Sequence, residues 1–310
     1  MRSITVASGK GGTGKTTLSA LFAHMAAESL NVVVADADVE ASNLPLALRL
    51  EHGSCEVFEG GLKAVIRADR CSACGVCAEA CRFGAISVDD ERYRVDAVVC
   101  EGCGTCAYVC PLDAVSMVRQ KAGEACTGMS VVGPIAYGQL RPGYDLSGKL
   151  VTEVRSRAVA LGAVHGADVL IIDGPPGTGC PAIASITGTD LIVAVAEPTR
   201  SGAHDLGRLE TLARRFALGV VVVLNKADLS SAGAREVRDL CTARDLPLLA
   251  EIPFDPALVD ALAGLASGAT LGDMPAKSQA MRIVRETWEQ LDAMLSESGP
   301  AVYRPKPAWR

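Results

Sequence analysis

Short apolar segments alternate with longer segments of helical periodicity near both ends of the chain. A brief apolar run bounded by turn-forming residues is typical of a buried strand, whereas apolar positions spaced three and four apart predict a helix. The first run is followed by a glycine loop, a helix and a second run, which predicts the opening of a parallel sheet. We predict strands at Ile4 to Ala7, Asn31 to Ala35, Asp168 to Ile172, Leu191 to Ala196 and Gly219 to Leu224, and helices at Leu18 to Leu30, Gly148 to Val164, Ala203 to Phe216, Ala232 to Thr242 and Ser278 to Leu295.

The pattern changes between about Ala64 and Val118, where eight of the twelve cysteines lie among glycines and short strand-like pieces. The alternation of strands and helices returns after Leu150. This order predicts a mostly parallel α/β sheet with helices on both faces, interrupted by a small α+β insert. We assign residues 1–63 and 119–296 to the α/β domain, 64–118 to the insert, and 297–310 to a proline-containing tail without periodicity.

The composition is that of a globular protein with a sizeable core. Hydrophobic residues make up 49% of the 310 residues and charged residues 21%, and the formal net charge is −6. A nucleic-acid-binding protein would show a basic excess, and a membrane span would need a much longer apolar run than any in the sequence. The sequence opens on a strand and a glycine loop without the pattern of a signal peptide, so we expect a cytoplasmic protein whose thiols are reduced and available to metal.

A phosphate-binding loop follows the first predicted strand. Gly9, Gly14, Lys15 and Thr16 satisfy the pattern Gly-x-x-x-x-Gly-Lys-Thr between a strand and a helix, the context that this pattern requires. In such a loop the N–H groups converge on phosphate oxygens at the positive end of the helix. We expect Lys15 to reach the β and γ phosphates and Thr16 to ligate magnesium. The predicted nucleotide-binding residues here are Gly9, Lys10, Gly11, Gly12, Thr13, Gly14, Lys15, Thr16 and Thr17.

An additional lysine early in the loop, Lys10, carries a family resemblance. The segment Lys-Gly-Gly-Thr-Gly-Lys-Thr-Thr resembles the deviant Walker A P-loop ATPases, which include MinD, ParA, the Mrp cluster carriers and the nitrogenase iron protein. The resemblance implies magnesium-dependent ATP hydrolysis, slow without a partner protein. It also implies a sandwich dimer, formed with a second copy or a paralogue, in which Lys10 reaches the phosphates of the partner.

Two carboxylates follow apolar strands, where open α/β sheets bind ligands. Asp38 matches the switch I aspartate of the family, which is expected to orient the attacking water beside magnesium, and Asp36 is expected to support it from the strand. Many relatives have proline where this chain has Val39. Asp173 ends the apolar run beginning at Val169, the Walker B arrangement that holds magnesium through water. The glycine-rich segment after Asp173 resembles a switch II loop.

The base of the nucleotide is expected near a later strand end. Asn225, Lys226, Ala227 and Asp228 match the guanine-reading motif of GTPases, whereas in deviant Walker A relatives an asparagine at this place reads adenine. The type of phosphate loop favours ATP, with GTP as the alternative. Pro253 lies in a segment that resembles the second base-side loop of the family, and the alternative for it is a proline turn before a helix.

The insert contains an internal repeat. Cysteines at 71, 74, 77 and 81 recur 29 residues later at 100, 103, 106 and 110, and the residues that follow each run are also alike. The repeat resembles a bacterial two-cluster ferredoxin, in which three cysteines of one run and the last cysteine of the other hold each 4Fe-4S cluster. The resemblance implies two sets. The first cysteine set is Cys71, Cys74, Cys77 and Cys110, and the second cysteine set is Cys100, Cys103, Cys106 and Cys81.

Zinc is the alternative occupant, because paired Cys-x-x-Cys units commonly bind it. Two sets of four at this spacing favour iron and sulfur. Arg82 stands where proline usually follows the fourth cysteine, and its charge would raise the potential of a neighbouring cluster. Two such centres close together imply electron transfer.

Four cysteines lie outside the repeat. Cys55, Cys126 and Cys241 have no partner at a motif spacing, and we expect free thiols. Cys180 follows the switch II-like segment, at the spacing of a cysteine that binds a shared cluster in the nitrogenase iron protein. We therefore consider Cys180, with another thiol such as Cys126, as a candidate for an interface metal site. The alternative is a thiol at a helix start, without metal.

Almost the whole chain resembles MinD-superfamily ATPases that carry an inserted ferredoxin domain, found chiefly in anaerobic prokaryotes. The leading hypothesis is an ATP-driven switch coupled to electron transfer through two 4Fe-4S clusters, with an unidentified redox protein or cluster acceptor as partner. The alternatives are a cluster or metal carrier of Mrp type and a MinD-like spatial organiser. The segment from Arg282 to Leu291 mixes charges, so we predict a helix packed on the domain and not a membrane-binding one.

Overall fold

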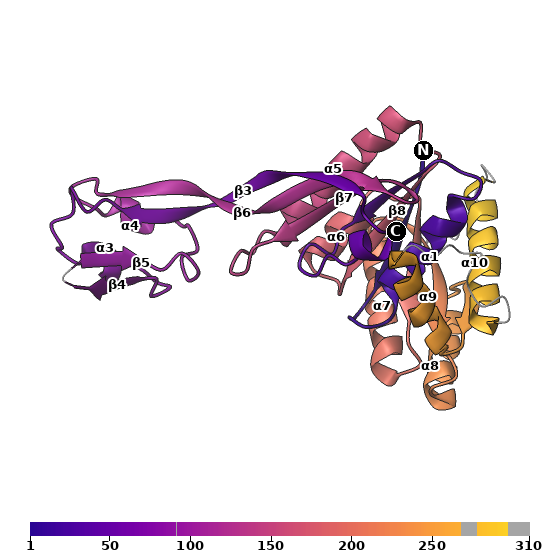
Figure 1. The fold of residues 1–310 in the computed structure, drawn as a ribbon. Helices are drawn as coiled ribbons and strands as arrows, with labels where there is room; N and C mark the ends of the chain where they lie inside the picture. Colours follow the sequence, from indigo (N-terminus) through magenta and orange to yellow (C-terminus); the bar gives the residue numbers. More distant parts are fainter. Residues whose placement is uncertain (91, 268–277, 297–310) are drawn as a thin grey trace. The chain divides into compact units, whose positions relative to one another are not determined.

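The structure is a computed structural model that describes residues 1–90, 92–267 and 278–296. The predicted tail at 297–310 lies outside the described residues. The chain forms two compact units (Figure 1). The first unit consists of Met1–Cys55, Ala125–Gln139 and Gly148–Arg310, and the second unit consists of Glu56–Glu124 and Leu140–Ser147.

A sheet of nine described strands, in the order β11-β10-β9-β1-β8-β2-β7-β6-β3, organises the chain. From β11 to β7 the neighbouring strands pair in parallel, which confirms the mostly parallel α/β fold. The strands are β1 (Arg2–Ser8), β2 (Val32–Asp36), β3 (His52–Ile66), β6 (Val115–Ser130), β7 (Gly133–Leu140), β8 (Val169–Pro176), β9 (Leu191–Ala196), β10 (Gly219–Asn225) and β11 (Leu248–Ile252).

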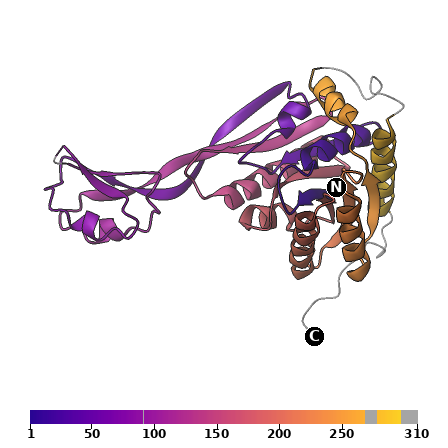
Figure 2. The same ribbon diagram turned by 90° about the horizontal axis from the view of Figure 1, so that it is seen from below.

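Helices cover both faces of this sheet (Figure 2). Successive side chains of a strand point to opposite faces, so β1 contributes Val6 to one hydrophobic core and Ala7 to the other. The core that contains Val6 is closed by α1 and α10, and the core that contains Ala7 is closed by α7 and α8. The helices of this part of the chain are α1 (Lys15–Ala26), α2 (Leu44–Ala47), α5 (Ser147–His165), α6 (Cys180–Ile186), α7 (Arg200–Arg215), α8 (Ser231–Ala243), α9 (Pro256–Ala266) and α10 (Gln279–Ser296).

The long strands β3 and β6 form a ribbon that continues from the first unit into the second. The N–H of Glu51 donates to the carbonyl of Met129 at 2.9 Å, and that of Arg67 donates to the carbonyl of Ala114 at 2.7 Å. Residue numbers rise on one strand as they fall on the other, so the pair is antiparallel. Most side chains of β3 are exposed. Backbone hydrogen bonds therefore define this ribbon, and apolar periodicity gives no sign of it.

The second unit is wider than the insert expected at 64–118. It takes in more of both ribbon strands, and also the segment from Leu140 to Ser147, where the N–H of Arg141 donates to the carbonyl of Ala122 at 2.8 Å. Its remaining elements are α3 (Val76–Glu79), the antiparallel hairpin of β4 (Ile86–Asp89) and β5 (Arg92–Val95), and α4 (Thr105–Tyr108).

The two halves of the repeat have the same local structure. Gly75 and Gly104 adopt positive φ angles of 81° and 78°, and each precedes a one-turn helix. The small core of this unit contains Ala64 and Ile86 together with buried cysteines. Cys77, Cys100 and Cys106 are therefore part of the core of this unit.

Helix α10 packs on the first unit, as the sequence predicts. The rings of Trp288 and Phe22 of α1 lie with their centroids 6.0 Å apart, and Leu291 is 0% exposed in the same core. No helix among the described residues has an apolar stretch long enough to cross a membrane.

We predict that Leu291→Ala lowers the free energy of unfolding of the first unit by about 2–5 kcal/mol, because it leaves a cavity in a closed core. The exposed neighbour Gln290 provides the control, and Gln290→Ala should change that free energy by less than about 0.5 kcal/mol. Urea unfolding followed by circular dichroism measures both. Equal effects of the two variants would contradict the packing of α10.

Candidate functional site

Polar residues collect at the carboxyl ends of five neighbouring strands of the first unit. β1 ends at Ser8, β2 at Asp36 and β10 at Asn225, Glu197 directly follows β9, and Asp173 lies near the end of β8. Because parallel strands finish at one edge of the sheet, these side chains share one region, which is where open α/β sheets bind ligands.

The loop between β1 and α1 has the conformation that a phosphate site needs. Gly14 has a φ of 93°, and a Cβ at this residue would lie 2.4 Å from Nδ2 of Asn225, so both angle and space require glycine. Lys15 is the first residue of α1 and is 6% exposed. A Cβ at Gly11 or Gly12 would meet nothing within 4 Å, so one side of the loop is open to a ligand.

One buried group of this loop fits a phosphate. Thr13 is 2% exposed, and its buried hydroxyl has no hydrogen-bond partner among the described atoms. A buried hydroxyl without a partner is costly. A phosphate oxygen in the loop would provide the missing acceptor.

Asp173 is held by two hydroxyls of α1. Thr16 donates from Oγ1 to Oδ2 of Asp173 at 2.6 Å, and Ser19 donates to Oδ1 at 2.9 Å. The structure thus brings Thr16 and Asp173 together, as the magnesium prediction requires. Ser19 is a residue that motif reasoning missed, although its place one turn after Thr16 on the same helix was a usable signal.

Asp36 organises the segment that carries Asp38. Its carboxylate accepts the N–H of Asp38 at 3.0 Å, the hydroxyl of Ser42 at 2.7 Å and the N–H of Leu44 at 3.0 Å. This is the supporting position expected for Asp36. Ser42 and Leu44 were not singled out by the sequence motifs.

Positively and negatively charged side chains lie close together in this partly buried site. Burial lowers the pKa of Lys15, and the carboxylates of Asp173 and Asp38 oppose that shift. Burial raises the pKa of Asp38, and Lys15 opposes it. Lys15, Asp38 and Asp173 therefore act on one another electrostatically.

The register of the sheet places Asp36 opposite Asp173. Burial, reinforced by the charge of Asp173, raises the pKa of Asp36 to about 8. Burial also raises the pKa of Asp173 to about 6, against the bonds from Thr16 and the charge of Lys15. Two buried carboxylates side by side favour either a shared proton or a bound cation.

Lys10 is engaged within its own chain. Its Nζ lies 2.9 Å from Oε2 of Glu197, and Oε1 of Glu197 lies 2.7 Å from Nζ of Lys226. Lys226 also donates to the carbonyl of Gly12 at 2.9 Å. Sequence reasoning missed Glu197, which had no motif. Its position directly after a buried strand was the available signal.

The predicted base-side residues lie beside the phosphate loop. Nδ2 of Asn225 donates to the carbonyl of Thr13 at 2.8 Å, so this amide holds the phosphate loop. Asp228 accepts the N–H of Phe254 at 2.6 Å, which ties it to the segment of Pro253. The two predicted base-side segments are thus adjacent.

Each cysteine set lines its own small cavity in the second unit. The cavity of the first cysteine set also meets Tyr93 and Leu112, and that of the second cysteine set also meets Phe83 and Met117. In both cases the fourth cysteine comes from the other half of the repeat. The structure therefore groups the eight thiols in the two sets that the ferredoxin resemblance implies.

Polar groups around the two sets differ. Oγ1 of Thr105 lies 3.4 Å from Sγ of Cys103. Lys63 donates from Nζ to the carbonyl of Cys100, and that Nζ lies 5.4 Å from the centre of the Tyr144 ring. The bond from Thr105 is the first cause of a lowered pKa of Cys103.

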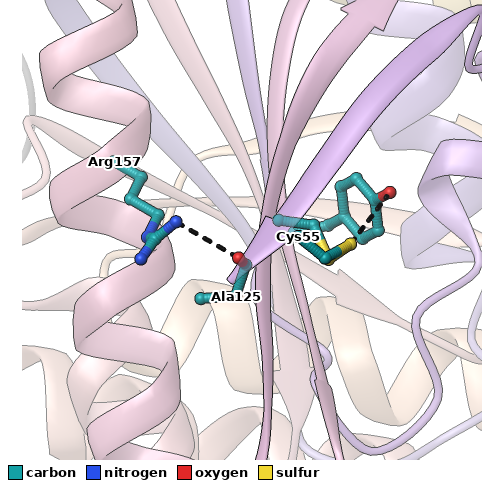
Figure 3. The surroundings of a disulfide bond; sticks show 5 residues. Cys55, Ala125 and Arg157 are labelled. Carbon is teal, nitrogen blue, oxygen red and sulfur yellow. Dashed lines mark hydrogen bonds between the residues drawn. A yellow bond between two sulfur atoms is a disulfide. The ribbon is translucent and has the colours of Figure 1, made fainter. Parts of the chain in front are cut away.

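The prediction of free thiols is wrong for Cys55 and Cys126, which form a disulfide (Figure 3). Cys55 lies on β3 and Cys126 on β6, and the antiparallel register sets them opposite each other with Cα atoms 4.0 Å apart. A separation of 71 residues hides this pairing in the sequence. Beside the bond, Nη1 of Arg157 donates to the carbonyl of Ala125 at 3.2 Å.

The other two cysteines are free. Cys241 is a free thiol, as expected. It is buried, and burial raises its pKa to about 11. Cys180 is exposed at the start of α6. Because Cys126 is bonded to Cys55, it is not the free thiol that the interface hypothesis assigned to Cys180.

Comparisons with known proteins agree with this geometry. Residues 4–265 match the family described as CobQ/CobB/MinD/ParA nucleotide binding domain. The uncharacterized protein MJ0578 of Methanocaldococcus jannaschii is 34% identical over 229 residues, which are 74% of this chain and 79% of that protein. The uncharacterized protein MJ0579 of the same organism is 26% identical over 256 residues, 74% of this chain and 82% of that protein.

Solved structures share the fold. The septum site-determining protein MinD of Pyrococcus horikoshii, complexed with Mg-ADP, has a TM-score of 0.58 at 20% identity, covering 95% of this chain and 97% of its own. A ParA family ATPase of Chlorobium tepidum has a TM-score of 0.53 at 15% identity, covering 93% and 98%. With the phosphate loop, the paired strand-end carboxylates and the match over residues 4–265, the chain belongs to the CobQ/CobB/MinD/ParA family of nucleotide-binding domains.

Proposed function

We propose that this chain is a magnesium-dependent ATPase that closes as a dimer on ATP and couples this switch to electron transfer through two 4Fe-4S clusters. The observation that carries the proposal is the coexistence of a strand-end nucleotide site in one unit and two four-cysteine cavities in the other.

The nucleotide half is supported by complementary groups. Lys15 and the unpartnered hydroxyl of Thr13 suit phosphate oxygens, and Thr16 with Asp173 suits a magnesium ion. Asp38 lies within electrostatic reach of Lys15, where it would orient the attacking water. Asn225 and Asp228 would border the base. Lys10 would exchange Glu197 for the phosphates of the partner.

The cluster half is supported by the spacing of the thiols. Four sulfurs around one zinc ion would lie about 3.8 Å apart, given a Zn–S distance of about 2.3 Å in a tetrahedron. Among the described residues, no three of the eight repeat cysteines have sulfurs that all lie within 4.8 Å of one another. This favours a larger inorganic group over a single ion. A 4Fe-4S cluster in each cavity would accept and release one electron at a time.

The likeness of fold to MinD favours a second candidate, a nucleotide-dependent spatial organiser. That role needs a surface for a membrane or a partner. The apolar side of α10 does not offer a membrane surface, because Val284, Trp288 and Leu291 are buried in the core of the first unit. An organiser would therefore have to localise through another protein.

Variants of the two loop lysines should distinguish ATP binding from ATP-dependent dimerisation. Lys15→Ala should weaken ATP binding about 10- to 100-fold, the value of one charge-assisted bond to phosphate. Lys10→Ala should bind ATP within about threefold of the unchanged chain yet form no ATP-dependent dimer. Fluorescent-nucleotide titration and analytical ultracentrifugation measure the two properties. A Lys10→Ala protein that still dimerises on ATP would contradict the trans role of Lys10.

Iron content tests the cluster half. Anaerobically prepared protein should contain about eight iron and eight sulfide per chain. Cys77→Ala should lose about half of both, whereas Cys241→Ala, which changes a buried thiol outside the repeat, should retain all. Chemical analysis of iron and sulfide measures this content. Colourless protein after reconstitution would contradict this half of the proposal.

The carboxylate pair predicts a pH dependence of stability. The folded chain holds protons on Asp36 and Asp173 up to about pH 8 and about pH 6, whereas the unfolded chain loses them near pH 3.9. The folded state therefore binds more protons, and without ligands the stability should fall as pH rises from about 4 to about 8.

Magnesium and ATP should flatten this slope, because the cation takes the place of the protons. Asp36→Asn should flatten it without ligands. Thermal unfolding at a series of pH values measures the effect. A stability that rises with pH across this range would show that the pair is not protonated in the folded state.

A further inference from the structure

The two cysteine sets have matched ligands but unmatched surroundings. From this difference we propose that the second cysteine set holds the cluster of higher reduction potential, so that an electron entering the second unit comes to rest there. This inference rests on the proposed cluster function and adds a direction to it.

One hydrogen bond is common to both sets. The N–H of Ala85 donates to Sγ of Cys81 at 3.4 Å, and the N–H of Ala114 donates to Sγ of Cys110 at 3.2 Å. Ala85 and Ala114 are equivalent in the repeat. This bond stabilises extra negative charge on both sets, so it does not distinguish them.

A hydroxyl is present at only one of two equivalent positions. Thr105 lies two residues after Cys103, and Val76 lies two residues after Cys74. The Thr105 hydroxyl is 3.4 Å from Sγ of Cys103 and would donate to a thiolate there, whereas valine has no donor. Donors to ligand sulfurs stabilise the reduced form and raise the potential.

A buried cation also lies at the second cysteine set. Lys63 is 9% exposed, and its Nζ donates to the carbonyl of Cys100. Among the described residues Lys63 has no carboxylate partner. A buried charge needs compensation, and a cluster with four thiolates, more negative once reduced, would supply it.

The exposed arginines do not decide between the sets. Arg82 follows Cys81 of the second set, but Arg70 precedes Cys71 of the first, and both side chains are exposed. Solvent and salt screen such charges. Ser72 and Tyr93 line the cavity of the first set, but among the described residues neither hydroxyl has a hydrogen bond to a cysteine sulfur. The difference in hydrogen bonds and buried charge therefore lies in Thr105 and Lys63, which are close to ligand residues of the second set.

The electron step needs no further reactant. When a one-electron donor has reduced the first site, transfer oxidises that site by one electron and reduces the second by one. No covalent bond forms or breaks, and no proton moves. The direction follows from the stabilisation of negative charge by Lys63 and Thr105.

The internal repeat supplies matched variants. Thr105→Val gives the second set the residue of the first, and Val76→Thr makes the reverse change at an exposed position of a one-turn helix. Lys63→Met removes the cation and keeps the length of the side chain. The full chain, prepared without oxygen, is titrated with dithionite and followed by electron paramagnetic resonance.

Two midpoint potentials are expected in the unchanged protein. Thr105→Val and Lys63→Met should each lower the higher midpoint, by about 59 mV for a tenfold change in electron distribution, and leave the lower one in place. Val76→Thr should raise the lower midpoint. Circular dichroism and iron content confirm that each variant folds and is loaded.

The inference is overturned if Thr105→Val and Lys63→Met move the lower midpoint, or if neither moves the higher one. Protein that binds no iron would instead refute the proposed cluster function. The two failures are therefore distinguishable, because the second appears in the iron analysis before any potential is measured.

Discussion

The placement of two carboxylates side by side at the end of a parallel sheet is the constraint on which the nucleotide site depends. β2 and β8 pair so that Asp36 lies opposite Asp173, and both side chains are buried. Such a pair is stable only with a proton or a cation between or beside the charges. Lys15 and the hydroxyls on α1 compensate part of the negative charge of this pair. A bound magnesium–nucleotide complex would compensate the rest, so ligand binding would stabilise the fold at this edge of the sheet.

The central sheet and the phosphate loop could be predicted because local patterns encode them. β9 begins and ends where its apolar run does, and the loop residues are fixed by their spacing. The ribbon strands β3 and β6 could not be predicted in this way. Most side chains of β3 are exposed, the buried positions of β6 do not alternate regularly with exposed ones, and the two strands are distant in sequence. The disulfide of Cys55 and Cys126 follows from the register of that ribbon and was missed with it.

The candidate site shows the same division between motif and packing. Lys10, Asp38 and Asp173 carry motifs, and the structure places them around one edge of the sheet. Glu197 and Ser19 have no motif, because their role depends on which strand and which helix turn face the loop. Motif spacing identifies the residues that would bind a common ligand. The residues that hold these ligand-binding residues in place are identified only from their contacts in the structure.

The disulfide lies where the ribbon passes between the two units. Cys55 is the last residue of the first unit on β3, and Ala125, beside Cys126, is the first residue of that unit on β6. A covalent bond across an antiparallel pair fixes its register, so β3 and β6 cannot slide past each other at this point. The chain reaches β3 from the segment that Asp36 holds through Ser42 and Leu44. The stretch between β2 and the middle of β3 is therefore held at both ends, by the hydrogen bonds of Asp36 at its start and by the disulfide at its end.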